Sequence, residues 1–207
     1  MTAQPATGAD HQLPGVLADA HAQAVAALEA GNPLDAVVWL SAHVAAGQHT
    51  VHRAAGKRGA IRRKLVAARA ADHELEQVLR RAEQHHSGDV LAAQLSEGRL
   101  DASLRRALES HARAERDLVC GVLDHLDDAG TAQLSEAYDE ALRHAPTRPH
   151  PHTPHKGVFG SVAFRIDAMR DRMMDTMDGR HVPAPRMPRR PVKSGRWGRY
   201  VLGEMEK

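Results

Sequence analysis

His111 and Glu115 stand one helical turn apart in the segment LRRALESHARAERDLVCGVLDHL, residues 104–126. Read as a helix, this segment carries a stripe of apolar side chains that includes Leu108 and Leu118. At roughly 100° per residue, His111 and Glu115 both fall in the middle of that stripe. The pattern therefore predicts a helix that directs an imidazole and a carboxylate toward the protein core.

A buried carboxylate needs a partner, because removing its charge from water costs several kcal/mol when nothing compensates it. A metal ion would provide that partner, and imidazole together with carboxylate suits iron, manganese or zinc. Facing helices of a bundle can supply such ligands around one point. The simpler interpretation is a salt bridge or a hydrogen-bonded core histidine, and the residues alone leave both interpretations open.

Other histidines fall on or near the apolar stripes of the preceding helices. In the first helix His21 lies inside the stripe, and in the second His43 lies at its edge. Gly47 lies at the centre of the second stripe, one turn after His43. His49 and His52 point away from it, and we expect them to be solvated.

The third helix permits two interpretations of its phase. Asp72 falls on the edge of its apolar stripe, whereas His73 and Glu76 lean away from it. A shift of one residue in the helical phase would reverse this order. We therefore keep both Asp72 and His73 as candidates for an inward position.

The elements that must position these residues are helices. Hydrophobic residues make up 42% of the chain but aromatic residues only 3%, so the core must be aliphatic and rich in alanine, which favours helix. Four amphipathic helices are predicted at about 14–30, 33–55, 61–86 and 102–128. None can bury its stripe alone, so we predict an all-α fold built on an up-down-up-down four-helix bundle.

These segments resemble those of the hemerythrin-like, or HHE cation-binding, proteins. The resemblance rests on ADAHAQAVAALEAG, LSAHVAAGQHTVH, ARAADHELEQVL and SHARAERDLV, one from each helix, and on the wording of the C-terminal extension. It implies a four-helix bundle that holds a non-haem di-iron centre. The matching positions, which we take as candidate metal ligands, are His21, His43, His73, His111 and Glu115.

Two positions depart from the family pattern. Gly47 stands where the resemblance implies a bridging glutamate, and Gln77 stands one turn after His73, where it implies a further ligand. The ligand set is therefore short for two irons. A mononuclear iron site, an altered site, and a metal-free bundle that acts as an interaction or regulatory module all remain open. If iron binds, the resemblance implies binding or sensing of dioxygen, peroxide or nitric oxide.

The chain divides into three predicted parts. Residues 13–130 form the bundle, residues 131–178 form a helical extension joined by a strap rich in proline and histidine, and residues 179–207 form a basic tail. The extension carries a face of apolar side chains that we expect to dock within the chain or to form a homodimer contact: Phe159, Val162, Ile166, Met169, Met173 and Met177. The tail interleaves arginines with Trp197 and Tyr200, a mix that could bind nucleic acid, but it carries no known motif and we interpret it as a solvated arm.

Composition excludes several other classes. The formal charge is +2, and the single cysteine, Cys120, permits no intramolecular disulfide, which fits a reducing compartment. No signal peptide or apolar run of membrane-spanning length is present in the sequence, so we expect a cytoplasmic protein. A glycine-rich phosphate loop, a nucleophile elbow and a CxxC motif are all missing from the sequence. We therefore expect a binding protein rather than an enzyme that acts on an organic substrate.

Overall fold

The structure is a computed structural model that describes residues 13–86, 97–149, 168–171 and 173–177. These residues contain no strand, which confirms the predicted all-α class. Their helices are α1 (Leu13–Glu29), α2 (Pro33–His49), α3 (Val51–Gly56), the 3₁₀ helix η2 (Gly59–Ile61), α4 (Arg62–His86), α5 (Glu97–Leu123) and α6 (Asp128–Arg143), followed by helical residues in 168–171 and 173–177. Helix α5 begins and ends earlier than the predicted range of 102–128.

The turn between α1 and α2 follows from three consecutive residues. Gly31 takes φ of +75°, a left-handed conformation that glycine adopts without steric strain. The backbone N–H of Asn32 donates to the carbonyl of Ala27 at 2.8 Å, and the N–H of Gly31 donates to Leu28 at 3.2 Å, which together close the end of α1. Pro33 then begins α2, where its missing N–H would have no helical partner.

The predicted second helix, 33–55, is wrong in one respect, because it is divided at Thr50. The hydroxyl of Thr50 donates to the carbonyl of Ala46 at 2.7 Å, and its backbone N–H donates to the same carbonyl at 3.0 Å. Thr50 takes φ of −115° and ψ of −74°, helix α2 ends at His49, and α3 begins at Val51.

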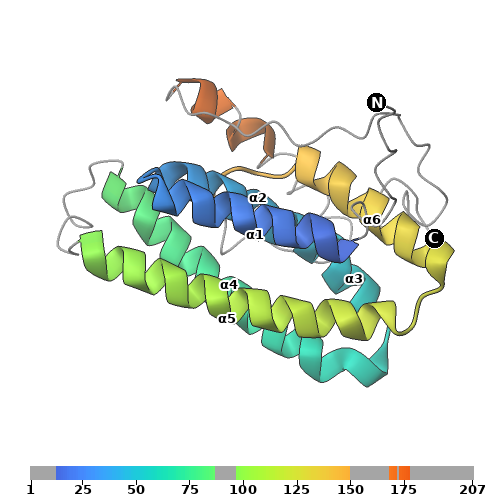
Figure 1. Cartoon of the computed structure of the whole chain (residues 1–207). Helices are drawn as coiled ribbons and strands as arrows, with labels where there is room; N and C mark the ends of the chain where they lie inside the picture. Colours follow the sequence, from blue (N-terminus) through green and yellow to red (C-terminus); the bar gives the residue numbers. More distant parts are fainter. Residues whose placement is uncertain (1–12, 87–96, 150–167, 172, 178–207) are drawn as a thin grey trace, which may run out of the picture.

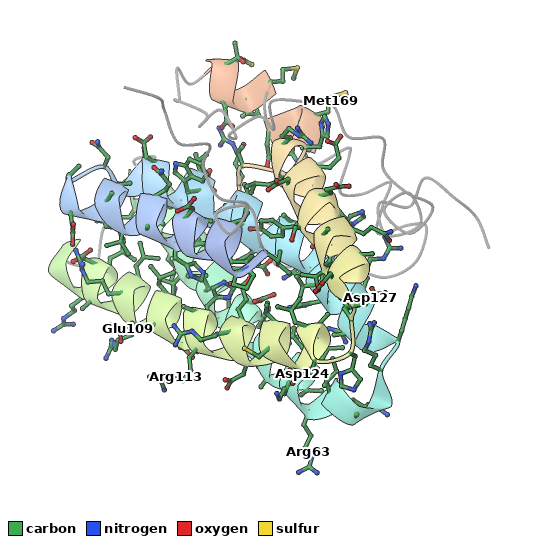
Figure 2. All side chains as sticks on the ribbon, turned by 45° about the vertical axis from the view of Figure 1, so that its right-hand side comes forward. Arg63, Glu109, Arg113, Asp124, Asp127 and Met169 are labelled. Carbon is green, nitrogen blue, oxygen red and sulfur yellow. The ribbon has the colours of Figure 1, made fainter. Side chains whose placement is uncertain are left out.

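The helices pack as two adjacent pairs with α6 alongside. Helix α1 contacts α2, and α4 contacts α5 along their lengths, while α2–α4 and α1–α5 contacts join the two pairs. Helix α6 packs on α1 and α2 (Figure 1). Charged side chains such as Arg63, Glu109, Arg113 and Asp124 point outward from α4 and α5 and their ends (Figure 2). The predicted boundary between residues 130 and 131 falls inside α6.

Two apolar clusters fill the core, and a polar layer separates them. On α5, Leu108 belongs to one cluster and Leu118 to the other, with His111 and Glu115 between them. The same order occurs on α1, where His21 lies between Leu17 of one cluster and Ala24 of the other, and on α4, where Asp72 lies between Ala68 and Leu75. The polar residues therefore gather at one level of the helical body.

The chain after α6 is held by buried polar contacts. The backbone N–H of Arg148 donates to Asp171 at 2.8 Å, and its guanidinium lies 3.3 Å from Asp175 and 3.2 Å from Glu83 of α4. Thr147 donates a further hydrogen bond to Asp175, which is fully buried. These contacts tie residues 168–177 to α4.

The methionines of this segment face outward. Met169, which is labelled in Figure 2, Met173 and Met177 are 71%, 62% and 73% exposed. Asp171 and Asp175 are buried. The predicted docking of the methionine face within the chain is therefore wrong for these three side chains. The aspartates of the segment face the chain instead, where they contact Thr147 and Arg148. Several predicted features lie outside the described residues. They are Phe159, Val162, Ile166, the histidines of the strap at 150–155 and the basic tail 179–207. No helix that the structure describes has the length and apolarity needed to cross a membrane.

Candidate metal centre

Three histidines and one glutamate from three helices converge in the polar layer. They are His21 on α1, His43 on α2, and His111 and Glu115 on α5, and one ligand atom from each lies within 4.8 Å of all the others. His43, His111 and Glu115 are buried, and the side chain of His21 retains 19% exposure. Helix α5 contributes two of the four because residues four apart lie on the same helical face.

The distances in this cluster match those between neighbouring ligands of one ion. The Nε2 atom of His43 lies 3.0 Å from Nε2 of His21 and 3.1 Å from Nε2 of His111. The carboxylate of Glu115 lies 3.2 Å from His43, 3.4 Å from His21 and 4.0 Å from His111. Two ligand atoms that each lie about 2.1 Å from a metal are separated by about 2.9 Å at a right angle and about 3.4 Å at the tetrahedral angle.

A second group of residues orients two of these imidazoles. The Nδ1–H group of His111 donates to Asp72 Oδ1 at 2.9 Å. Because an ionised carboxylate can only accept, this bond leaves the Nε2 lone pair of His111 directed into the cluster. Nδ1 of His43 lies 2.5 Å from the hydroxyl of Tyr138 on α6, so its Nε2 also faces the cluster. A partner on the far nitrogen is the usual way in which proteins orient a metal-binding histidine.

Asp72 is itself held by α2 and α3. The Nε2 group of Gln48 donates to Asp72 and to Glu76, both at 3.1 Å. Nε2 of His52 lies 3.6 Å from the second oxygen of Asp72. The other amide atom of Gln48, Oε1, is buried and has no hydrogen-bond partner among the described residues.

The carboxylates of the centre stay ionised. Burial by itself raises the pKa of Glu115, but the imidazoles, His43 foremost, outweigh it and lower the pKa to about 2. Burial also raises the pKa of Asp72, and the charges and hydrogen bonds of His52 and His111 outweigh it in the same way. In the described part of the chain, the ion-pair partners of both carboxylates are histidines. Among the described residues, no lysine or arginine forms an ion pair with either carboxylate.

The imidazoles differ in their affinity for protons. Burial lowers the pKa of His21 to about 3, so this ring is neutral and offers a lone pair. For His111, burial lowers the pKa, but the hydrogen bond and charge of Asp72 outweigh it and the pKa is raised. Burial and the charge of Glu115 raise the pKa of Tyr138 far above its usual value of 10, so the phenol keeps its proton.

His73 does not join the cluster. It lies on the exposed face of α4, where the amide of Gln77 donates to its Nε2 at 2.8 Å. Asp72, one residue earlier, is buried, so for these two residues α4 keeps the phase in which Asp72 faces the core and His73 leans away. Glu76 is also buried, and the prediction that it leans away is wrong. We therefore leave His73 out of the ligand set that we propose.

Three further positions can be compared with what the sequence indicated about them. A Cβ atom built on Gly47 would lie 3.5 Å from Glu115 Oε1, so the missing side chain of Gly47 is a gap beside the cluster. The prediction that His49 and His52 are solvated is wrong, because both are buried. His52 lies on α3, which contacts α4, and its Nε2 atom is 3.6 Å from Asp72.

Sequence reasoning missed Tyr138 altogether. It lies on α6, beyond the four helices of the predicted bundle, and 95 positions separate it from His43. One signal was available, because a tyrosine on the apolar face of α6, together with Leu134 and Ala141, must find a partner for its hydroxyl when it is buried.

Comparison with known proteins adds no assignment. No protein-family model matches the chain, and no curated protein or solved structure is significantly similar to it. The structure by itself gives an all-α protein with a buried group of three histidines and one glutamate that could hold a metal ion.

Proposed function

We propose that this protein binds a metal ion, with non-haem iron as the first candidate, through His21, His43, His111 and Glu115. The observation that carries the proposal is the convergence of three Nε2 atoms and one carboxylate at the spacing of metal ligands. In support, Asp72 and Tyr138 contact the far nitrogens of His111 and His43 and leave the near nitrogens facing the cluster.

We propose that α1, α2, α4 and α5 form the up-down-up-down bundle of the hemerythrin-like proteins. The pairing of α1 with α2 and of α4 with α5, and the short turn at Gly31, support this topology. The placement of the cluster halfway along these helices supports it further, because facing helices of a bundle can direct ligands to one point in its core. The three helices that carry the cluster are the first, second and fourth of this set.

One metal ion fits these residues better than two. A second iron would need ligands from the positions of Gly47 and Gln77, but Gly47 has no side chain and Gln77 is exposed. Asp72 and Glu76 are further buried carboxylates near the cluster, but Asp72 is engaged by His111 and Gln48, and Glu76 by Gln48. We therefore propose a mononuclear centre.

The ligand set suits iron, manganese or zinc. When bound with free coordination positions, iron would supply a place for a small ligand such as dioxygen, peroxide or nitric oxide. The side chains of this chain would position the metal, and the partly exposed His21 marks the side from which solvent approaches. We place this protein in the cytoplasm, as a binding protein rather than an enzyme.

The alternative is a metal-free bundle that serves as an interaction module. One observation favours it, because the imidazoles and Glu115 already lie at hydrogen-bonding distances from one another. In that case the cluster is a polar network within the core. Substitution of a ligand residue distinguishes the two functions, because only a metal centre would lose bound metal.

Elemental analysis of protein purified without chelator, and again after anaerobic reconstitution with ferrous iron, tests the proposal. Wild-type protein should hold one iron, manganese or zinc ion per chain. His43→Ala should lose it, and His73→Ala, an exposed histidine on α4, is the matched control that should keep it. Folding of both variants is checked by circular dichroism, and Glu115→Gln provides a second ligand variant if His43→Ala does not fold.

Bound metal should also stabilise the fold. A metal present at about 100 times its Kd adds about 2.7 kcal/mol to the free energy of unfolding. For a chain of this size, that raises Tm by about 5–10 °C. A folded wild-type protein that takes up no iron, manganese or zinc and shows no shift in Tm would rule out the metal centre in favour of the metal-free module.

A further inference from the structure

We infer that α6 completes the metal centre through Tyr138, which acts as a positioning residue for His43. The inference rests on the proposed metal-binding function and extends it beyond the four helices of the bundle. Helix α6 would then contribute to metal affinity, and bound metal would help to hold α6 in place.

His43 is the ring on which the whole cluster depends. Its Nε2 atom is the one that lies within 3.2 Å of His21, His111 and Glu115 together. Its other nitrogen, Nδ1, lies 2.5 Å from the hydroxyl of Tyr138. Both side chains are 0% exposed, so water cannot replace this contact. The tyrosine hydroxyl therefore determines where the central imidazole points.

Tyr138 and Asp72 hold their histidines in chemically different ways. Asp72 can only accept, so His111 keeps a proton on Nδ1 and a lone pair on Nε2. A phenol hydroxyl can either accept or donate. When Tyr138 accepts from Nδ1, the Nε2 lone pair of His43 is free for a metal. When Tyr138 donates to Nδ1, Nε2 carries the proton and can donate to Glu115 at 3.2 Å.

This difference gives His43 two satisfied arrangements. With Nε2 protonated, its hydrogen bond to Glu115 keeps the cluster closed without metal. With Nε2 deprotonated, the same ring can be a ligand while Tyr138 still holds its far side. Phenylalanine at position 138 would support neither arrangement, because Nδ1 would be left buried without a partner.

The position of Tyr138 is fixed by the core rather than by the cluster. Its ring packs in one apolar cluster with Leu134 of the same helix, Leu17 of α1 and Leu118 of α5. Helix α6 contacts both α1 and α2, which carry His21 and His43, and lies along them in Figure 1. A change in the docking of α6 would therefore move the hydroxyl relative to His43.

The first test compares metal affinity in three variants of the full-length chain, with Co²⁺ as the probe and its visible absorption as the signal. Tyr138→Phe removes only the hydroxyl and should weaken Co²⁺ binding about 10- to 100-fold, as is usual for the outer partner of a metal-binding histidine. Ser135→Ala, which removes a buried hydroxyl one turn earlier on α6, should bind Co²⁺ like the wild type. Leu134→Ala loosens the packing of α6 while it keeps the hydroxyl, and it should also weaken Co²⁺ binding because the hydroxyl moves relative to His43.

The second test measures hydrogen exchange of α6 with and without Co²⁺. Coupling between two sites is reciprocal, so if docked α6 strengthens metal binding, bound metal should slow local exchange in α6 of the wild type. In Tyr138→Phe this effect of the metal should largely disappear. A tyrosine that only fills space in the core would leave the metal response of α6 unchanged.

The outcomes separate this inference from the proposed function. If wild-type protein binds no Co²⁺, or His43→Ala binds it as well as the wild type, the metal centre itself is wrong and the role of Tyr138 falls with it. If His43→Ala loses Co²⁺ but Tyr138→Phe keeps the wild-type affinity, the centre stands and the positioning role is overturned.

Discussion

Asp72→Asn tests whether the carboxylate behind His111 organises the centre. The substitution keeps the shape of the side chain and replaces one carboxylate oxygen by an amide nitrogen. Asp72 accepts from His111 Nδ1 at 2.9 Å on one oxygen and from Gln48 Nε2 at 3.1 Å on the other. An asparagine can accept on only one of these sides.

Either orientation of the new amide leaves two donors facing each other. If its oxygen faces His111, its nitrogen meets the amide nitrogen of Gln48. Gln48 cannot turn its own oxygen inward, because that oxygen would then face the carboxylate of Glu76. A buried donor without an acceptor costs about 1–3 kcal/mol. We expect metal-free Asp72→Asn to unfold at a Tm lower by about 2–10 °C.

The effect on metal affinity should be larger than the effect on the fold alone. Loss of the outer partner of a metal-binding histidine weakens binding by about 10- to 100-fold. The assay is Co²⁺ titration at pH 8, with urea unfolding of the metal-free protein measured in parallel. Glu76→Gln is the matched control, because it removes the same charge one turn along α4, alters the other partner of Gln48, and keeps the bond between Asp72 and His111. Equal Co²⁺ affinity in Asp72→Asn and Glu76→Gln would show that the bond to His111 does not organise the centre.

Two other substitutions follow from the structure. Gly47→Ala should raise the free energy of unfolding by about 0.5–1 kcal/mol, because it removes a glycine from a helix and its Cβ fits in ordinary contact with Glu115. A lower Tm in calorimetry, or loss of bound metal, would contradict this. Arg148→Met should leave the buried Asp175 without its guanidinium partner and make local opening of residues 168–177 easier by up to about 3 kcal/mol. Hydrogen exchange should then rise in that segment while α1 to α5 stay protected, and unchanged exchange in the segment would show that the guanidinium of Arg148 does not hold it.

Local sequence determined most of the helices. The high content of alanine and leucine, the scarcity of aromatic residues and the turn at Gly31 and Pro33 predict both ends of α1 and the start of α2 to within about one residue, whereas the predicted end of the second helix lies beyond the end of α2 at His49. The pairing of His111 with Glu115 on one buried face also follows from their spacing alone, since residues four apart share a helical face. In each case the interactions that decide the outcome lie within one or two turns of the same helix.

The membership of the centre was decided by tertiary structure. A phase difference of one residue rotates a side chain by roughly 100°, so the pattern of α4 could not choose between Asp72 and His73, and packing against α5 made the choice. The burial of His52 was likewise decided by packing, because α3 contacts α4 and α5 and His52 lies beside Asp72.

Tyr138 shows the same limit over a longer distance. Its contact with His43 joins residues 95 positions apart, and no periodicity within either helix encodes it. The sequence determined that α6 has an apolar face with a hydroxyl on it, whereas the docking of that face on α1 and α2 decided which polar group the hydroxyl meets. The physical reason is that helical propensity and amphipathicity are set by neighbours in the chain, while the partner of a buried polar group is set by which helices pack together.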